Sequence, residues 1–387
     1  MSSVKPTKEP LSVDPAIATK PNNVDALPSL LKEINTGVYS LVSGEPPGVL
    51  SAILFGVDCG LWKLMAHNGQ EIHKVSELAT ALGVDTVLLS RFMRHLGTMG
   101  YLVEVDENEY KGTNFTKALS IPAIGNSYMA MVSGTIAGAI KFHEFSRQRA
   151  WQNPTDARDT ALMYACKTDK DMFAWLESQG YGTHFNDHMG GYSLGRIPWM
   201  DPAIFPVQEQ LIAGAKKDPN SPFLVDIGGS TGHDLLKFTS YFPKTPGRLI
   251  LQDLPAVTRQ IKGLDPCIQV ISHNFFEEQP IKGARAYLLH SCLHDWPDSV
   301  CETILTHVKN AMTPGYSKLL ICEYVISKTN AHWEETALDM IMLADFSANE
   351  RTIEAWHHLV EDKVGLKIAN IWKSDGGTQS LIECELA

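Results

Sequence analysis

The sequence lacks the patterns that identify several common classes of protein. Its seven cysteines are odd in number and never form a C-x-x-C pair, which disfavours a disulfide framework and a structural zinc site. No long run of Lys and Arg occurs, and the formal net charge is −11. Clustered basic residues attract nucleic acids and anionic membranes, so neither is expected as a partner. We therefore expect a reduced protein that binds no metal.

Long apolar runs are also missing. The longest apolar stretch, residues 127–140, contains Ser133, Gly134 and Thr135 and is too short to cross a bilayer. Residues 1–23 are rich in Pro, Lys, Ser and Thr and have no apolar centre of the kind found in a signal peptide. We expect these residues to form a disordered tail, and the protein to be cytoplasmic with no membrane partner.

The first folded region that we predict covers residues 24–122. Apolar residues at helical spacing predict helices over residues 51–65 and 75–82, and a third helix that follows Asp85 as its N-cap. A β-hairpin is predicted next, with its turn at residues 106–108. Two short helices followed by a hairpin are typical of a winged helix.

A winged helix raises the alternative of DNA binding. The predicted recognition helix carries Arg91, Arg94 and His95, but the hairpin beside it is acidic and would repel phosphates. A dimerisation module is therefore the favoured interpretation of this region, and a homodimer the expected assembly. A DNA-binding regulator remains the less favoured one.

Residues 123–206 form a second region, which is helical and rich in Met, His, Phe and Trp. Flexible thioethers and aromatic faces suit an irregular organic ligand, although the same residue types fill ordinary protein cores. We predict a helical region that lines the site of a small-molecule substrate.

Residues 207–387 alternate between buried strands and helices. Strands are predicted at residues 224–227, 249–251, 286–289 and 318–321, and a C-terminal hairpin at residues 366–386 with its turn near residues 375–377. Such alternation predicts an α/β fold, in which a doubly wound, Rossmann-like parallel sheet has helices on both faces.

The sharpest local signal is a glycine-rich turn that directly follows the first of these strands. Gly228, Gly229 and Gly232 allow a tight turn and a close approach of a ligand to the backbone. The turn has neither the G-x-G-x-x-G spacing of dinucleotide sites nor the Gly-Lys-Ser/Thr of phosphate loops. Asp253 ends the next strand, where a carboxylate can bind both hydroxyls of a ribose. A nucleoside ligand without phosphates fits best, and NAD remains an alternative.

Several further motifs carry a resemblance to a known family. They are the run Leu289-His290-Ser291-Cys292-Leu293-His294-Asp295-Trp296-Pro297-Asp298, the segment Gln252-Asp253-Leu254-Pro255, the segment Asn274-Phe275-Phe276 and the segment Glu350-Arg351-Thr352. Together with the glycine-rich turn, they resemble the S-adenosylmethionine-dependent O-methyltransferases of the plant caffeate type and of fungal secondary metabolism. The resemblance extends from about residue 53 to the C-terminus and includes the winged-helix module, which forms a homodimer in that family.

The resemblance implies a catalytic set and a cofactor. His294 matches the family's general base, and Glu323 and Glu350 match the two acids that flank it. A histidine suits this task because its pKa lies near neutral pH, and carboxylates can orient its ring. The methyl donor, S-adenosylmethionine, is already activated, so the protein must supply only alignment and a base.

The resemblance also implies binding residues. Gly228, Gly229, Gly232 and Asp253 would bind the cofactor, with Asn274 and Phe275 beside its adenine. His290 stands where the family usually has Lys or Arg. By the same resemblance Phe185, Met189 and Met342 would contact the acceptor. Met131 and His143, from the Met- and His-rich middle region, are further expected acceptor residues.

A second function remains open. Some fungal proteins that resemble this family bind S-adenosylmethionine but catalyse pericyclic or dehydration steps without methyl transfer. The set of His294, Glu323 and Glu350 favours methylation of a hydroxyl on a small aromatic or polyketide-type acceptor, and His143 would be an additional polar group in a pericyclase site.

Overall fold

The computed structural model describes residues 45–67, 72–192, 196–373 and 379–387, and these residues form two compact units. Of the described residues, 45–59 and 72–113 belong to the first unit, and 60–67, 114–192, 196–373 and 379–387 belong to the second. The predicted N-terminal tail and the predicted turn of the C-terminal hairpin both fall outside the described residues.

The first unit combines short helices with a small antiparallel sheet. Its elements are α3 (Glu45–Asp58), β1 (His73–Lys74), α5 (Val75–Leu82), α6 (Thr86–Thr98), β2 (Leu102–Asp106) and β3 (Glu109–Gly112). The three strands pair in the order β1-β3-β2. Asp85 caps α6 by accepting a hydrogen bond from the N–H of Leu88 at 2.8 Å, as predicted, and Leu89, Met93 and Leu96 on one side of that helix are buried. The predicted hairpin is present.

The helix predicted over residues 51–65 is wrong in its extent. The structure has α3 up to Asp58 and a separate helix, α4 (Leu61–His67), after it. Gly60 lies between them with a φ of +81°. This left-handed conformation suits glycine and ends the first helix, which the apolar periodicity alone did not reveal.

Helices surround a large sheet in the second unit. After α4 the elements are α7 (Asn114–Ala118), α8 (Pro122–Tyr128), η2 (Met129–Thr135), α9 (Ile136–Gln148), α10 (Ala161–Cys166), α11 (Met172–Ser178), α12 (Gly182–Tyr192), η3 (Gln208–Ile212), β4 (Pro222–Ile227), α13 (His233–Tyr241), β5 (Arg248–Asp253), α14 (Pro255–Thr258), β6 (Ile268–Ser272), β7 (Ala286–His290), η4 (Leu293–Asp295), α15 (Asp298–Lys309), β8 (Lys318–Tyr324), α16 (Trp333–Phe346), α17 (Ile353–His357), η5 (His358–Lys363), β9 (Leu366–Lys373) and β10 (Gln379–Leu386). In the part of the chain that the structure describes, no single helix is long and apolar enough to cross a membrane.

The seven strands of the large sheet lie in the order β6-β5-β4-β7-β8-β10-β9. The first five strands in this order are parallel, and β10 is antiparallel to both β8 and β9. All four predicted strands and the C-terminal hairpin are present. The prediction missed β6, which lies at the sheet edge with most of its side chains exposed. An edge strand has no continuous apolar run, so its sequence resembles a loop.

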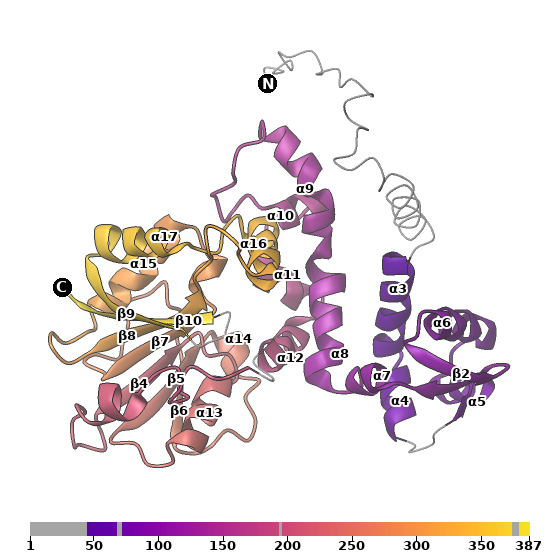
Figure 1. The fold of residues 1–387 in the computed structure, drawn as a ribbon, viewed down its shortest axis with the longest axis horizontal. Coiled ribbons are helices and arrows are strands. Elements are labelled where there is room, and N and C mark those ends of the chain that lie inside the picture. Colours follow the sequence, from indigo (N-terminus) through magenta and orange to yellow (C-terminus); the bar gives the residue numbers. More distant parts are fainter. Residues whose placement is uncertain (1–44, 68–71, 193–195, 374–378) are drawn as a thin grey trace, which may run out of the picture. The chain divides into compact units, whose positions relative to one another are not determined.

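Helices cover both faces of the sheet, so the inner strands are buried on both sides. One core packs α15, α17 and η5 against residues such as Val225, Leu289 and Ile321. The other packs α13 and the segment around η3 against alternate residues such as Leu224 and Leu288. Figure 1 shows the sheet between these two layers of helices. The sequence therefore folds into an α/β Rossmann-like unit in which the carboxyl ends of β4, β5, β7 and β8 meet at one edge.

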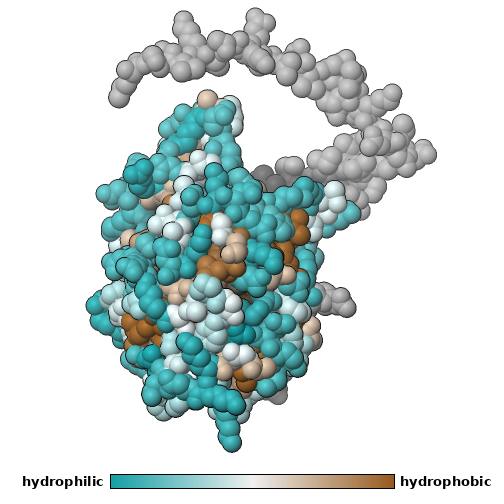
Figure 2. All heavy atoms as spheres, turned by 90° about the vertical axis from the view of Figure 1, so that its left-hand side faces the viewer, coloured by the Kyte–Doolittle hydropathy of each residue, from teal (hydrophilic) through white to brown (hydrophobic). Residues whose placement is uncertain are grey.

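The surface has a different composition from these cores. On the face drawn in Figure 2, hydrophilic residues cover most of the surface, and hydrophobic residues appear in separate patches. Exposed large apolar side chains nevertheless occur in both units, including Val87 and Val103 in the first and Ile140 and Trp333 in the second. Single exposed apolar residues are ordinary on folded proteins.

Candidate functional site

The glycine-rich turn connects β4 to α13 in a conformation that requires glycine. Gly228 and Gly232 have φ values of +72° and +92°. A Cβ atom on Gly228 would lie 2.9 Å from the Cys292 sulfur, and one on Gly229 would lie 2.3 Å from a carboxylate oxygen of Asp226. The two glycines at the start of the turn donate their N–H groups to the carbonyl of Gln252 in β5. The turn is therefore a tight, half-buried cradle of backbone.

Two carboxylates lie at this turn. Asp253, at the end of β5, accepts hydrogen bonds from the N–H groups of Ser230 and Leu254, both at 2.7 Å. Burial raises the pKa of Asp253 to about 6, against the two N–H donors, which lower it. Asp226, in β4, is fully buried, and neither of its carboxylate oxygens has a hydrogen-bond partner among the described residues. Burial, reinforced by the neighbouring Asp234, raises the pKa of Asp226.

An aromatic cluster lies beside the same turn. The ring of Phe275 is 3.6 Å from the position that a Cβ of Gly228 would take. Its centroid is 4.9 Å from that of Phe276 and 6.4 Å from that of Trp296. Asn274 uses its side-chain oxygen to accept the N–H of Phe276 at 3.1 Å, which leaves its NH₂ group available for other partners. The structure thus brings Phe275 to the glycine-rich turn, with Asn274 next to it.

His290 has a different environment from the other expected cofactor residues. It ends β7, and its Nδ1 lies 2.7 Å from the carboxylate of Asp234 in α13, while its Nε2 lies 3.4 Å from Gln379. Burial lowers the pKa of His290, but Asp234 and Cys322 outweigh burial and raise it well above the usual value. The half-buried imidazole is therefore already paired with Asp234 within the protein.

The residue expected as the base sits on a short turn after β7. Glu323, in the neighbouring strand β8, stabilises this turn, η4. Its Oε1 accepts the N–H groups of Cys292 and Leu293 at 2.9 and 2.8 Å. Glu323 is completely buried. A carboxylate that accepts two backbone N–H groups orients the turn as well as its own second oxygen.

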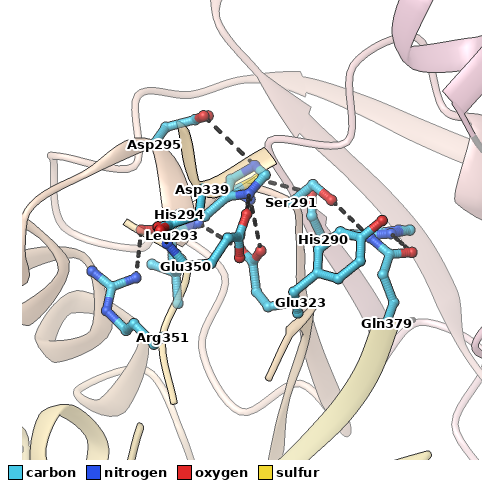
Figure 3. A network of polar contacts seen from close by, with 12 residues as sticks. His290, Ser291, Leu293, His294, Asp295, Glu323, Asp339, Glu350, Arg351 and Gln379 are labelled. Atoms are coloured by element: carbon cyan, nitrogen blue, oxygen red, sulfur yellow. Dashed lines mark hydrogen bonds and ion pairs between the residues drawn. The ribbon is translucent and has the colours of Figure 1, made fainter. Parts of the chain in front are cut away.

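The imidazole of His294 lies among three carboxylates, which Figure 3 shows converging on it. Its Nδ1 is 2.7 Å from Glu350 Oε1 and 3.7 Å from Glu323 Oε2, and its Nε2 is 3.6 Å from Asp295 Oδ1. Glu350 is itself held in place, because its N–H donates to Asp339 of α16 at 2.9 Å. The structure therefore brings His294, Glu323 and Glu350 together from three separate segments of the chain.

This arrangement changes the proton affinity of the site. Burial by itself lowers the pKa of His294, but the carboxylates of Glu323, Asp295 and Glu350 outweigh burial and raise it to about 10. Burial raises the pKa of Glu350, and it raises that of Asp295 to about 7. The cluster consequently holds a proton on the imidazole at neutral pH and gives it up only in the alkaline range.

The same three side chains could also hold a cation. Within the described residues, ligand atoms of His294, Glu323 and Glu350 all lie within 4.8 Å of one another. The second oxygens of the two glutamates are buried and have no hydrogen-bond partner in that part of the chain. The geometry is compatible with a metal ion as well as with a hydrogen-bonded imidazole, so the prediction of a metal-free site requires an experiment.

Three of the expected acceptor residues lie on helices that pack together. Phe185 of α12 and Met342 of α16 belong to one apolar cluster, and the ring of Phe185 is 5.7 Å from that of Phe173. Met189 lies one turn further along α12. Two contacts link these helices to the rest of the site. The Ser230 hydroxyl of the glycine-rich turn donates to the side-chain oxygen of Asn186 in α12 at 3.4 Å, and α16 packs against η4.

The other two expected acceptor residues have different positions. Met131 is half-buried in η2, which packs against α12. The side chain of His143 is 60% exposed on α9, and its Nε2 lies 3.8 Å from Glu144. The structure does not bring His143 together with His294.

Sequence reasoning missed three residues of this site. Asp295 faces the His294 ring, Asp226 lies beneath the glycine-rich turn, and Arg351 contacts the backbone of η4. All three lie within or directly beside the sequence motifs described above, so their position in those motifs could have indicated that they belong to the site. A carboxylate next to the base is the feature that could have been predicted from the sequence.

Comparison with known proteins gives a consistent result. The pattern of the O-methyltransferase domain matches residues 212–365. The chain is 34% identical to O-methyltransferase penC of Penicillium thymicola over 361 residues, which are 92% of this chain and 88% of that protein. Two solved structures, described as a pericyclic reaction enzyme and as LepI in complex with SAM, each match with a TM-score of 0.80 at 26% identity, over 96% of both chains.

The fold agrees with this similarity, which extends over nearly the whole length of this chain and of its relative. The chain therefore belongs to the O-methyltransferase family, whose methyl donor is S-adenosylmethionine.

Proposed function

We propose that this protein transfers a methyl group from S-adenosylmethionine to a hydroxyl of a small aromatic or polyketide-type acceptor, with His294 as the general base. The observation that carries the proposal is the buried imidazole among three carboxylates, at the sheet edge that also holds the glycine-rich turn. A base is the group that methyl transfer to a hydroxyl requires from the protein.

The residues at the turn fit this cofactor. A side chain on Gly228 or Gly229 would clash with Cys292 or Asp226, so only glycine permits this turn, and a turn without side chains lets a ligand approach the backbone closely. The carboxylate of Asp253 keeps unused acceptor capacity for ribose hydroxyls, and Phe275 offers an aromatic face. Asp226 lies directly beneath the turn, and its buried oxygens have no hydrogen-bond partner among the described residues.

The protein's own residues accept the proton, stabilise the resulting charge and exclude water. When bound, S-adenosylmethionine supplies a methyl group on a sulfonium, which needs no further activation. Glu350 accepts the Nδ1–H of His294, so Nε2 is the atom left to take the proton of the acceptor hydroxyl. The carboxylates then stabilise the imidazolium that results, and the apolar cluster with Phe185 and Met342 excludes water from the acceptor.

The proton affinity of His294 favours one class of hydroxyl. The pKa of His294 is about 10, and a phenol has a pKa of roughly 10 as well. Proton transfer between groups of matched pKa costs little, whereas an aliphatic alcohol holds its proton much more tightly. We therefore expect a phenol or an enol of similar acidity as the acceptor.

A transfer assay tests the proposal. The full-length protein is incubated with methyl-labelled S-adenosylmethionine and a panel of phenols, enols and aliphatic alcohols, with and without a chelator. We expect label to appear in phenolic or enolic products, with the same rate in both conditions. Loss of turnover with the chelator would show that the His294 cluster holds a metal ion, and an absence of any labelled product would contradict methyl transfer.

A second function is favoured by one of the similar structures, which is described as a pericyclic reaction enzyme. In that reaction the cluster around His294 would polarise a polyketide-type substrate, and no methyl group would be transferred. Mass spectrometry distinguishes the two functions, because a methylated product gains one CH₂ and a pericyclic product keeps the mass of its substrate.

We also propose that the first unit is a winged-helix dimerisation module. Its helices α5 and α6 and its three-stranded sheet support this assignment. The acidic hairpin residues Glu104 and Asp106 disfavour DNA binding, because they would repel phosphates. Light scattering should show a dimer at micromolar concentration, and salt-sensitive binding to DNA would contradict this assignment.

A further inference from the structure

Arg351 follows Glu350 in the chain, and its side chain is only 1% exposed. Its guanidinium contacts the backbone around His294. It donates one hydrogen bond to the carbonyl of Leu293 at 2.9 Å and another to the carbonyl of Trp296 at 2.8 Å. These two carbonyls lie directly before and after the pair His294 and Asp295 in the chain. Figure 3 shows Arg351 beside Leu293, on a different side of the turn from Glu323.

We propose that Arg351 is a positioning residue, which holds the backbone of η4 so that the His294 ring stays between Glu350, Glu323 and Asp295. This inference rests on the proposed role of His294. Glu323 binds the N–H groups at the start of the turn, and Arg351 binds the carbonyl groups at its two ends. A three-residue 3₁₀ turn has few hydrogen bonds of its own, so these external contacts determine its conformation.

The contacts require the shape of arginine and not merely its charge. The planar guanidinium donates from Nε to Asp298 at 2.9 Å, from Nη1 to the Leu293 carbonyl, and from Nη2 to both the Trp296 carbonyl and the Cys301 sulfur, the last at 3.3 Å. The single ammonium group of a lysine cannot span the same set of acceptors. The ion pair with Asp298 contributes less, because the side chain of Asp298 is 49% exposed and solvent weakens such pairs.

The structure offers a matched control, because Arg285 has the same kind of environment at the opposite end of β7. Arg285 is 8% exposed, and its guanidinium donates to the carbonyls of Leu211, Gln210 and Tyr316. These carbonyls belong to the helix η3 and to the loop before β8, away from the turn that carries His294. A change of Arg285 to Lys therefore tests the general effect of disturbing a buried arginine.

The experiment compares the unchanged protein with the variants Arg351→Lys, Asp298→Asn and Arg285→Lys, all as full-length chains. NMR follows the titration of the His294 imidazole, and this readout does not depend on whether any methyl transfer occurs. Thermal unfolding shows whether each variant is folded. Where an acceptor is known, kcat and its dependence on pH are measured, together with the KM for S-adenosylmethionine.

We expect Arg351→Lys to lower the midpoint of the His294 titration by about one pH unit, a tenfold change in proton affinity, because the ring moves away from its carboxylates. Its kcat should fall on the order of 10²-fold, the cost of a displacement of about 1 Å at a reacting group, with little change in KM for the cofactor. Arg285→Lys should leave the titration and the pH profile unchanged, even if it unfolds at a lower temperature, and Asp298→Asn should have a small effect.

Two outcomes would overturn the inference. One is a folded Arg351→Lys variant in which His294 titrates as in the unchanged protein. The other is an equal displacement in Arg285→Lys, which would mean that any buried arginine has this effect. If the unchanged protein transfers no methyl group but the titration shifts as expected, the positioning role stands and the proposed reaction fails.

Discussion

The cofactor cradle and the cluster around His294 are neighbouring regions of one sheet edge, but they are built in different ways. The cradle is a local structure. Gly228 and Gly232 have left-handed backbone conformations, which glycine adopts readily, so the shape of the turn follows from the residue type. The cluster is assembled from the end of β7, the end of β8 and the segment after α16, and its properties arise from charges that meet only in the folded protein.

This difference predicts that cofactor binding and proton transfer can be altered separately. The cradle depends on backbone shape and on single hydrogen bonds, so changes there should act on cofactor affinity. The cluster depends on coupled ionisable groups, so changes there should act on the proton transfer and on its pH dependence. The following predictions separate the two regions.

The largest effect is expected from His294→Ala. Removal of a general base costs roughly 10²–10⁴-fold in rate, while the cradle, which this change leaves intact, should bind S-adenosylmethionine almost normally. Single-turnover assays and calorimetry measure the two quantities on the same preparation. A matching loss of cofactor affinity would mean that the two regions are not independent. Full turnover to a product without an added methyl group would favour the pericyclic reaction.

An intermediate effect is expected from Asp253→Ala, which changes the cradle only. The loss of the hydrogen bonds to Ser230 and to the ribose should weaken cofactor binding by roughly 1–3 kcal/mol, or about 5–150-fold. Rates at saturating cofactor should stay near those of the unchanged protein. Calorimetry with S-adenosylmethionine and its demethylated product provides the measurement, and an unchanged affinity would remove Asp253 from the binding site.

The smallest loss of rate is expected from Glu350→Gln, and this change should also displace the pH profile. Only the neutral imidazole accepts the proton, and the pKa of His294 is about 10 because burial is outweighed by its carboxylates. Activity of the unchanged protein should therefore rise between neutral pH and about pH 10. Without the charge of Glu350 the pKa of His294 falls, so the rise should move toward acidic pH. A profile of kcat/KM that stays in place would contradict the electrostatic role of Glu350.

These predictions depend unequally on the sequence and on the structure. The strands, the Asp85 cap and the C-terminal hairpin follow from local patterns, and the structure confirms them. The break at Gly60 and the edge strand β6 escaped prediction, because a single glycine or an exposed strand carries a weak local signal. The position of His143 also escaped prediction, since periodicity does not reveal which face of an isolated helix is covered.

The sequence by itself determined the family resemblance, the glycine-rich turn and the identity of the residues expected around His294, because each of these depends on residue type and order along the chain. Only the tertiary structure decided that three carboxylates surround the imidazole, that Arg351 and Glu323 hold its turn, and that His290 pairs with Asp234. The physical reason is that proton affinity depends on burial and on charges within a few ångströms, and residues 56 positions apart, such as His294 and Glu350, become neighbours only through the fold.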